Sequence, residues 1–387
     1  MTIAYAMTSS ADAEAHAQLD FADASLAIPP LAWAKAAGSA ATAQLTASLS
    51  GDRVAALHDV TFSGGGLEAA LDADFDAGGL ARLDIAHLAV GETDAAGTLV
   101  RRADGGWHVV ITGAGFDATG LAKMLRSGAP DTTLSTAFDL DATLGRVILA
   151  AGHEARRVHG HLVSDGAHWQ TASVDASLAG GAAVRLRYGV AAKDRRFSLR
   201  SDDFGGLIHL VGVADNVRGG KLQVSGNAVD DGPRRRLDLA VTGENFRLVD
   251  ASMLAKLLSL TSYSGVRALL SGEGVPFSHL SAHILYGDDR MTINDFRATG
   301  SVIGVNASGT VDRDGGTLDL AGTLVPAFRL NTVLGMIPKI GDFLLGGSGE
   351  GVFGANFAIT GALDDPAVSV DFLSALAPGA LRKLLPQ

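Results

Sequence analysis

The sequence predicts a mainly β protein built on a long, strongly curved antiparallel sheet, groove- or taco-like, with a few short amphipathic helices. Three observations predict it. Apolar and polar residues alternate in short runs, which is the pattern of strands with one apolar face. Asp-Gly pairs and similar turn residues separate the runs, as in hairpins. The chain also has 49 glycines, and glycine permits tight bends in strands.

The clearest alternating runs mark the strands that this prediction depends on. They lie at 184–190, 197–201, 235–243 and 316–325. In the third run, Leu237, Leu239 and Val241 point to one face and Asp238 and Ala240 to the other, because successive side chains of a strand alternate.

The composition excludes several classes of protein. The 387 residues include 31 basic and 42 acidic ones, so the net charge is −11, which does not suit a nucleic-acid-binding surface. Cysteine is absent, which excludes disulfides, thiolate metal ligands and cysteine nucleophiles. No apolar run reaches the roughly 18 residues of a transmembrane helix. The N-terminus lacks the features of a secretory signal, which taken alone indicates the cytoplasm.

Three segments break the strand pattern and are predicted to be helical: 119–127, 250–272 and 330–347. Asp250 is a candidate N-cap of the second. The third is amphipathic, with a kink expected at Pro338, and its charged residues Lys339 and Asp342 argue against a membrane span. Its apolar stripe is expected to dock onto the sheet and close one end of it: Leu330, Val333, Leu334, Ile337, Ile340 and Leu344.

Three short helices cannot cover the apolar face of so long a sheet. The apolar faces must therefore meet each other or bind something apolar. The candidate lining positions are Leu237, Leu239, Val241, Ile303, Val305, Leu318, Leu320, Phe353, Phe357 and Ile359. The alternative is that these residues form an ordinary closed core.

The remaining motifs favour structural explanations. The glycine pattern of 349–354 follows a predicted helix and precedes a strand, the reverse of a dinucleotide-binding order. His153, His159, His161 and His168 have no carboxylate at an obvious ligand spacing, so we expect a surface strand and no metal. The basic run 234–236 suits a solvated strand end, with lipid-headgroup contact as the alternative. With no catalytic constellation recognised, we expect neither an enzyme nor a cofactor.

The C-terminal part of the chain carries a more specific succession of residues. It consists of Asn331, Ile337-Pro338, Gly341, Leu344-Leu345, Gly351, Gly361, Asp365-Pro366, Ala377-Pro378-Gly379 and Leu381-Arg382. With them, 270–385 resembles the AsmA-like C-terminal region of Gram-negative envelope proteins, the group of AsmA, TamB and YhdP, and is most similar to the YhdP type. Residues 24–41 and 113–125 resemble repeats of the same family.

The resemblance implies an organisation and a function. It implies an AsmA-like β-repeat region at 1–225, truncated at its N-terminal side, and an AsmA-like C-terminal region at 226–387. It also implies a periplasmic protein whose family is normally anchored in the inner membrane, so we expect an upstream segment beyond this sequence. The implied function is non-enzymatic: phospholipid acyl chains lie in a hydrophobic β-groove and move between the inner and outer membranes.

Two further expectations accompany this function. The C-terminal helices are expected to contact a membrane or an envelope protein, and no nucleic-acid partner is expected. The alternative function is a structural periplasmic scaffold, or an assembly factor for outer-membrane proteins, with a closed core.

Overall fold

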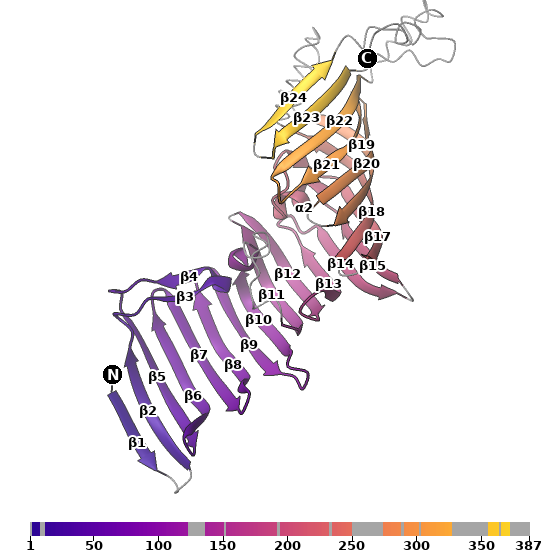
Figure 1. The fold of residues 1–387 in the computed structure, drawn as a ribbon. Helices are drawn as coiled ribbons and strands as arrows, with labels where there is room; N and C mark the ends of the chain where they lie inside the picture. Colours follow the sequence, from indigo (N-terminus) through magenta and orange to yellow (C-terminus); the bar gives the residue numbers. More distant parts are fainter. Residues whose placement is uncertain are drawn as a thin grey trace, which may run out of the picture. The chain divides into compact units, whose positions relative to one another are not determined.

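The computed structural model describes residues 2–7, 12–122, 136–150, 152–191, 194–231, 234–249, 274–287, 290–301, 303–326, 355–363 and 365–371. Two compact units divide the chain, one formed by 1–189 with 210–212 and the other by 190–209 with 213–387. Strands dominate both units and helices are few, which confirms the predicted mainly β fold (Figure 1).

The first unit is an open sheet of consecutive hairpins. Its strands are β1 (Thr2–Met7), β2 (Asp12–Asp20), β5 (Ala41–Ser50), β6 (Arg53–Gly64), β7 (Leu67–Asp76), β8 (Gly79–Val90), β9 (Thr93–Arg101), β10 (Trp107–Asp117), β11 (Phe138–Ala150), β12 (His153–Ser164), β13 (Trp169–Ser177) and β14 (Ala183–Ala191). Neighbours pair antiparallel in this order, except that β10 and β11 are parallel. This parallel pairing departs from the antiparallel sheet that the sequence predicts.

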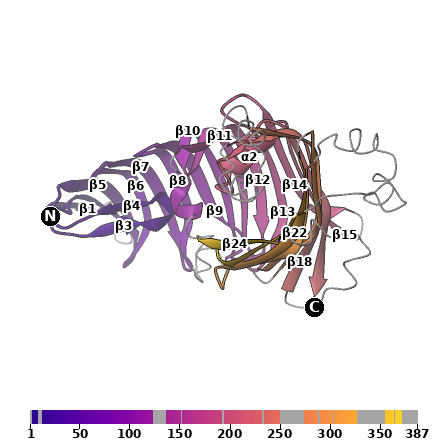
Figure 2. The same ribbon diagram turned by 90° about the horizontal axis from the view of Figure 1, so that it is seen from above.

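A small hairpin lies at one end of these strands (Figure 2). It consists of β3 (Leu26–Ile28), the 3-10 turn η1 (Pro29–Leu31) and β4 (Trp33–Lys35). Trp33 is buried and packs edge-on against Phe62 of β6, with ring centroids 6.0 Å apart. Its indole N–H donates to the carbonyl of Gly65 at 2.9 Å. These contacts fix the hairpin to the apolar side of the sheet.

The second unit repeats the hairpin plan. Its elements are β15 (Asp194–Ser201), α2 (Phe204–Leu210), β16 (Val217–Arg218), β17 (Lys221–Asp231), β18 (Arg234–Leu248), β19 (Val275–Gly287), β20 (Arg290–Gly300), β21 (Ile303–Asp312), β22 (Thr317–Pro326), β23 (Ala355–Ala362) and β24 (Pro366–Asp371). β15 pairs with β17, and β17 to β24 pair consecutively and antiparallel. The short strand β16 pairs with β18.

Bulges at residues other than glycine bend the strands. Asp59, Arg157, Asn245 and Asp295 have φ between 48° and 52°, and each lies where the pairing register of its strand shifts. A bulge with one left-handed residue bends the strand and increases its twist. Asp and Asn tolerate this conformation better than most residues. The curvature therefore arises at these bulges as well as at glycine, which alone was considered in the sequence analysis.

Most of the residues predicted to be helical lie outside the described ranges. The structure describes 119–122 as helical, at the start of the predicted segment 119–127. The predicted helices at 250–272 and 330–347 lie outside the described residues. Helix α2 was not predicted, because Gly205 and Gly206 disfavour a helix. It forms because the Asp203 carboxylate accepts a hydrogen bond from the Gly206 N–H at 3.0 Å and because Phe204, Leu207 and Leu210 are buried.

The division of the chain into two units differs from the predicted division into two regions. The boundary between the units falls at 189/190 along the chain. The predicted boundary at 225/226 lies inside β17, which pairs with β15 and β18. The boundary at 225/226 rests on the family resemblance and stays a prediction.

Candidate functional site: the apolar faces of the two sheets

One face of the first sheet is apolar from strand to strand. Directly paired residues on neighbouring strands share a face. Following the pairing from β6 to β14 gives the row Val60, Leu71, Ile85, Gly97, Ile111, Ala142, Gly160, Val174 and Leu186. We call the face that contains this row the first apolar face.

The other face of the same strands is mostly polar. The equivalent row from β7 to β14 is Asp72, Asp84, Thr98, Val110, Asp141, His161, Ser173 and Arg187. Ion pairs across this face include Arg187 with Asp175 at 2.6 Å. Apolar and polar residues alternate along these strands because one face of the sheet is apolar and the other is polar.

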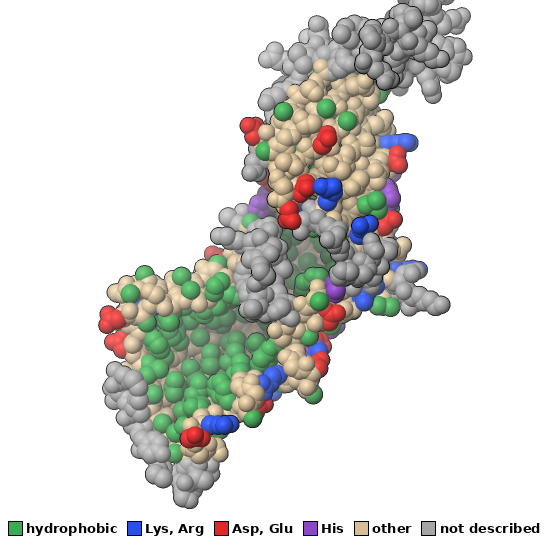
Figure 3. Space-filling model, in the orientation of Figure 1, with side chains coloured by type: hydrophobic (Ala, Val, Ile, Leu, Met, Phe, Trp, Pro, Cys, Tyr) green, Lys and Arg blue, Asp and Glu red, His purple; other side chains and the backbone are tan. Residues whose placement is uncertain are grey.

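The first apolar face is incompletely covered. Every side chain in its row, glycines aside, is partly exposed, including Leu71, Ile85 and Leu186. Figure 3 shows hydrophobic side chains gathered over the strands from β2 to β9. Since contiguous exposed apolar surface marks interaction sites, this face is a candidate binding surface.

One end of the first apolar face is closed by the hairpin β3–β4. Phe62 contacts both Trp33 and Phe21, with the Phe21–Phe62 ring centroids 6.1 Å apart. The Lys35 ammonium is buried and donates to four carbonyls, those of Phe21, Ala22, Ala24 and Ala36, at 2.8–3.2 Å. Each carbonyl thus has a charged donor, which stabilises the loop that closes this end.

The second sheet has an apolar face of the same kind. From β15 to β24 the pairing gives the row Phe197, Gly226, Leu239, Ile284, Ile293, Gly309, Leu320, Ile359 and Val368. We call the face that contains this row the second apolar face. Its side chains in this row are partly exposed.

The structure brings the described candidate lining residues together on the second apolar face. Leu239, Leu320 and Ile359 belong to the row just given. Leu237, Val241, Ile303, Val305, Leu318 and Phe357 lie on the same face in flanking rows. Phe353 lies outside the described residues, as do all six residues of the predicted helical stripe (Leu330, Val333, Leu334, Ile337, Ile340 and Leu344).

Burial separates two kinds of candidate. Ile303 is 1% exposed and Phe357 is 8% exposed, so both are packed residues. The other described candidates are partly exposed. Only the latter can contact a bound ligand without a rearrangement of the sheet.

One end of the second apolar face is packed by aromatic residues. Phe204 of α2 meets Phe246 of β18, with ring centroids 5.1 Å apart, and Phe246 stacks on Phe277 of β19 at 5.2 Å. All three are buried, and so is the adjacent Val275. Helix α2 therefore covers this end. The segment 330–347, predicted to close one end of the sheet, lies outside the described residues.

The first apolar face was not among the candidate sites predicted from the sequence. Residues 41–50 and 67–76 alternate as clearly as any run in the second half, for example Leu67, Leu71 and Phe75 against Glu68 and Asp72. This alternation predicts an apolar face in the first half of the chain, whereas all the candidate lining residues lie in 226–387, the predicted AsmA-like C-terminal region.

Charged residues at the turns keep those positions solvated. At the turn between β9 and β10, the Asp104 carboxylate accepts from the Arg102 side chain and from the Gly106 N–H at 3.0 Å. These interactions, chiefly the one with Arg102, lower the pKa of Asp104 to about 2.

No family model matches the chain, and no curated protein or solved structure matches it either. Among the described residues, no helix is both long enough and apolar enough to cross a membrane. The candidate site therefore rests on the two apolar faces and their geometry.

Proposed function

We propose that the protein is a non-enzymatic lipid carrier of the AsmA-like class, and that its apolar faces hold phospholipid acyl chains. The observation that carries this proposal is the pair of apolar rows, each spanning many strands and each left partly exposed. The proposed envelope location and the transfer between inner and outer membranes rest on the sequence resemblance.

The energetics of acyl chains support such a surface. Moving a sixteen-carbon chain from a bilayer into water would cost about 12 kcal/mol, at about 0.8 kcal/mol per CH₂. Moving the chain onto Leu, Ile, Val and Ala side chains costs far less, because its apolar area stays buried. A polar headgroup can remain in water at the rim. The surface thus lowers the barrier to movement but gives it no direction.

Lipid loading tests the proposal directly. The full chain is purified without detergent, incubated with phosphatidylethanolamine–phosphatidylglycerol vesicles, separated from them and measured by native mass spectrometry. We expect bound phospholipid on the wild type. Leu318→Asp and Leu45→Asp place a carboxylate on the second and first apolar faces, and we expect each to lower the bound lipid several-fold.

Matched controls lie on the polar faces of the same strands. Ala321→Asp on β22 and Gln44→Asp on β5 add the same residue at exposed positions, and we expect both to load like the wild type. Far-ultraviolet circular dichroism confirms that all four variants keep their strands. A wild type that takes up no phospholipid would support the scaffold alternative. Equal losses in the apolar-face variants and their controls would also contradict the acyl-chain site.

A further inference from the structure

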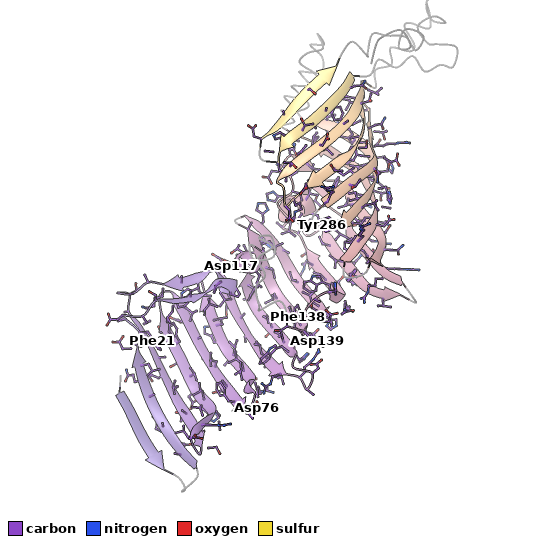
Figure 4. All side chains as sticks on the ribbon, in the orientation of Figure 1. Phe21, Asp76, Asp117, Phe138, Asp139 and Tyr286 are labelled. Carbon is purple, nitrogen blue, oxygen red and sulfur yellow. The ribbon has the colours of Figure 1, made fainter. Side chains whose placement is uncertain are left out.

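Two histidines and two aspartates gather on the polar face of the first sheet. His108 lies on β10, Asp139 and Asp141 on β11, and His161 on β12. His108 pairs with Asp139 across the parallel step, and Asp141 pairs with His161 across the next antiparallel pair. The four side chains therefore lie on the same face of three adjacent strands. Phe138, next to Asp139 in β11, points to the opposite, apolar face. Figure 4 labels these two residues side by side.

The ligand atoms are already close to one another. Nδ1 of His161 is 2.9 Å from Oδ1 of Asp141 and 3.6 Å from Oδ1 of Asp139. Nδ1 of His108 is 3.7 Å from Oδ2 of Asp139. One ligand atom each from His108, Asp139 and Asp141 lies within 4.8 Å of the other two; His161 is outside this group, although it lies close to both aspartates. An ion shared by all four residues requires the His108 and His161 side chains to rotate toward each other.

Asp139 at the centre of the cluster supplies an independent observation. Its Oδ1 atom is shielded from solvent and accepts no hydrogen bond among the described residues. The Asp139 side chain as a whole is 30% exposed, and Oδ1 lies 3.6 Å from Nδ1 of His161. A buried carboxylate oxygen without a partner is costly. A cation bound at that oxygen would remove the cost.

We propose that His108, Asp139, Asp141 and His161 form a site for a divalent transition-metal ion of the Zn²⁺ class. Two imidazole nitrogens and two carboxylate oxygens are a ligand set that tetrahedral Zn²⁺ accepts, whereas Ca²⁺ and Mg²⁺ prefer oxygen ligands alone. The two carboxylates balance the charge of the ion. Because His161 and Asp141 are 44% and 51% exposed, the ion can enter from solvent.

The position of the site gives it a structural role. It links β10, β11 and β12 where the sheet changes from antiparallel to parallel pairing. Arg102 also interacts with Asp139, but the largest cause of its raised pKa is its hydrogen bond with Asp104, and the charge of Asp139 is the smallest of the causes. Arg102 is therefore engaged elsewhere. This proposal stands independently of lipid binding.

Metal titration of the full chain, produced without a histidine tag and stripped with a chelator, tests the site. Zn²⁺ binding is followed by calorimetry, and Co²⁺ is used as a visible-absorption probe of tetrahedral geometry. We expect one equivalent of either ion. His108→Ala, His161→Ala and Asp139→Asn should each weaken binding at least about tenfold, the lower end of the loss caused even by outer-shell changes.

His283→Ala is the matched control. His283 also lies on a strand of a polar face and contacts a carboxylate, that of Asp238 at 2.5 Å, and this variant should bind Zn²⁺ like the wild type. Zn²⁺ should also raise the melting temperature of the wild type and not that of His108→Ala. Absence of stoichiometric binding, six-coordinate Co²⁺ spectra, equal affinity in His108→Ala, or preferential Ca²⁺ binding would each overturn the proposal.

Discussion

Phe357 of β23 lies directly over Gly322 of β22, its cross-strand partner. A Cβ atom at position 322 would be 2.5 Å from Cζ of Phe357 and 2.2 Å from the carbonyl oxygen of Asn306. The missing side chain of Gly322 is thus what allows the ring to pack against the sheet.

The first prediction concerns this contact. Gly322→Ala should lower the free energy of unfolding by about 1–3 kcal/mol, the usual cost of overpacking. Gly304→Ala on β21 is the control, because its Cβ would meet only carbonyl oxygens at 3.8 and 3.9 Å, which is ordinary contact. Urea denaturation of both variants measures the difference. Equal stability of the two variants would contradict the close packing.

The second prediction separates packed from open positions on the second apolar face. Phe357→Asp should unfold the second unit or greatly destabilise it, because Phe357 is 8% exposed and a carboxylate there would be buried. Leu318→Asp should leave the fold intact, because Leu318 is partly exposed. Thermal melts followed by circular dichroism distinguish the two. Unfolding of Leu318→Asp would indicate a closed core.

The third prediction concerns the Lys35 ammonium. Lys35→Met keeps much of the side-chain volume but removes the charged donor that four carbonyls share. Three of them, those of Phe21, Ala22 and Ala36, still accept from a backbone N–H. We expect the free energy of unfolding to fall by about 1.5–3 kcal/mol, the usual contribution of hydrogen bonds to a charged group. Lys221→Met is the control, because Lys221 is exposed, and it should change stability little. Hydrogen exchange of the 21–38 amides should increase only in Lys35→Met.

The fourth prediction concerns acid titration at a turn. Because Arg102 and the Gly106 N–H favour the charged carboxylate, the pKa of Asp104 is lowered to about 2. The stabilisation from this carboxylate is complete above the ordinary Asp pKa of about 3.9 and is lost as the pH falls through about 2. Carboxyl-carbon NMR of the wild type should give a midpoint near 2. Arg102→Gln should raise that midpoint, whereas Arg82→Gln should leave it unchanged.

Much of the fold could be predicted from local alternation. In 235–243 the pattern identified both the strand and its apolar face, and the structure places Leu237, Leu239 and Val241 on one face. Alternation is reliable here because one face packs apolar side chains and the other meets solvent. The pairing of β10 with β11 is a long-range relationship that no local pattern contains.

The candidate metal cluster shows why sites across strands escape such reasoning. Spacing along the sequence groups His161 with His159, only two residues away. The partners of His161 are instead Asp139 and Asp141, some twenty residues earlier, and they meet it only through the register of β11 and β12. His108 is brought in by the parallel step. Helix α2 was missed for a similar reason, since tertiary burial of Phe204 and Leu207 outweighs its glycines.

The consecutive hairpins of the first sheet also determine how the width of its apolar face changes when strands are added. From β5 to β9 each strand pairs with the next along the chain, so one more hairpin would widen the sheet by about 10 Å, two strand spacings. Residues already in place would keep their neighbours. Duplication of a segment that encodes one hairpin could therefore change the width of the sheet without disturbing the existing strand pairs.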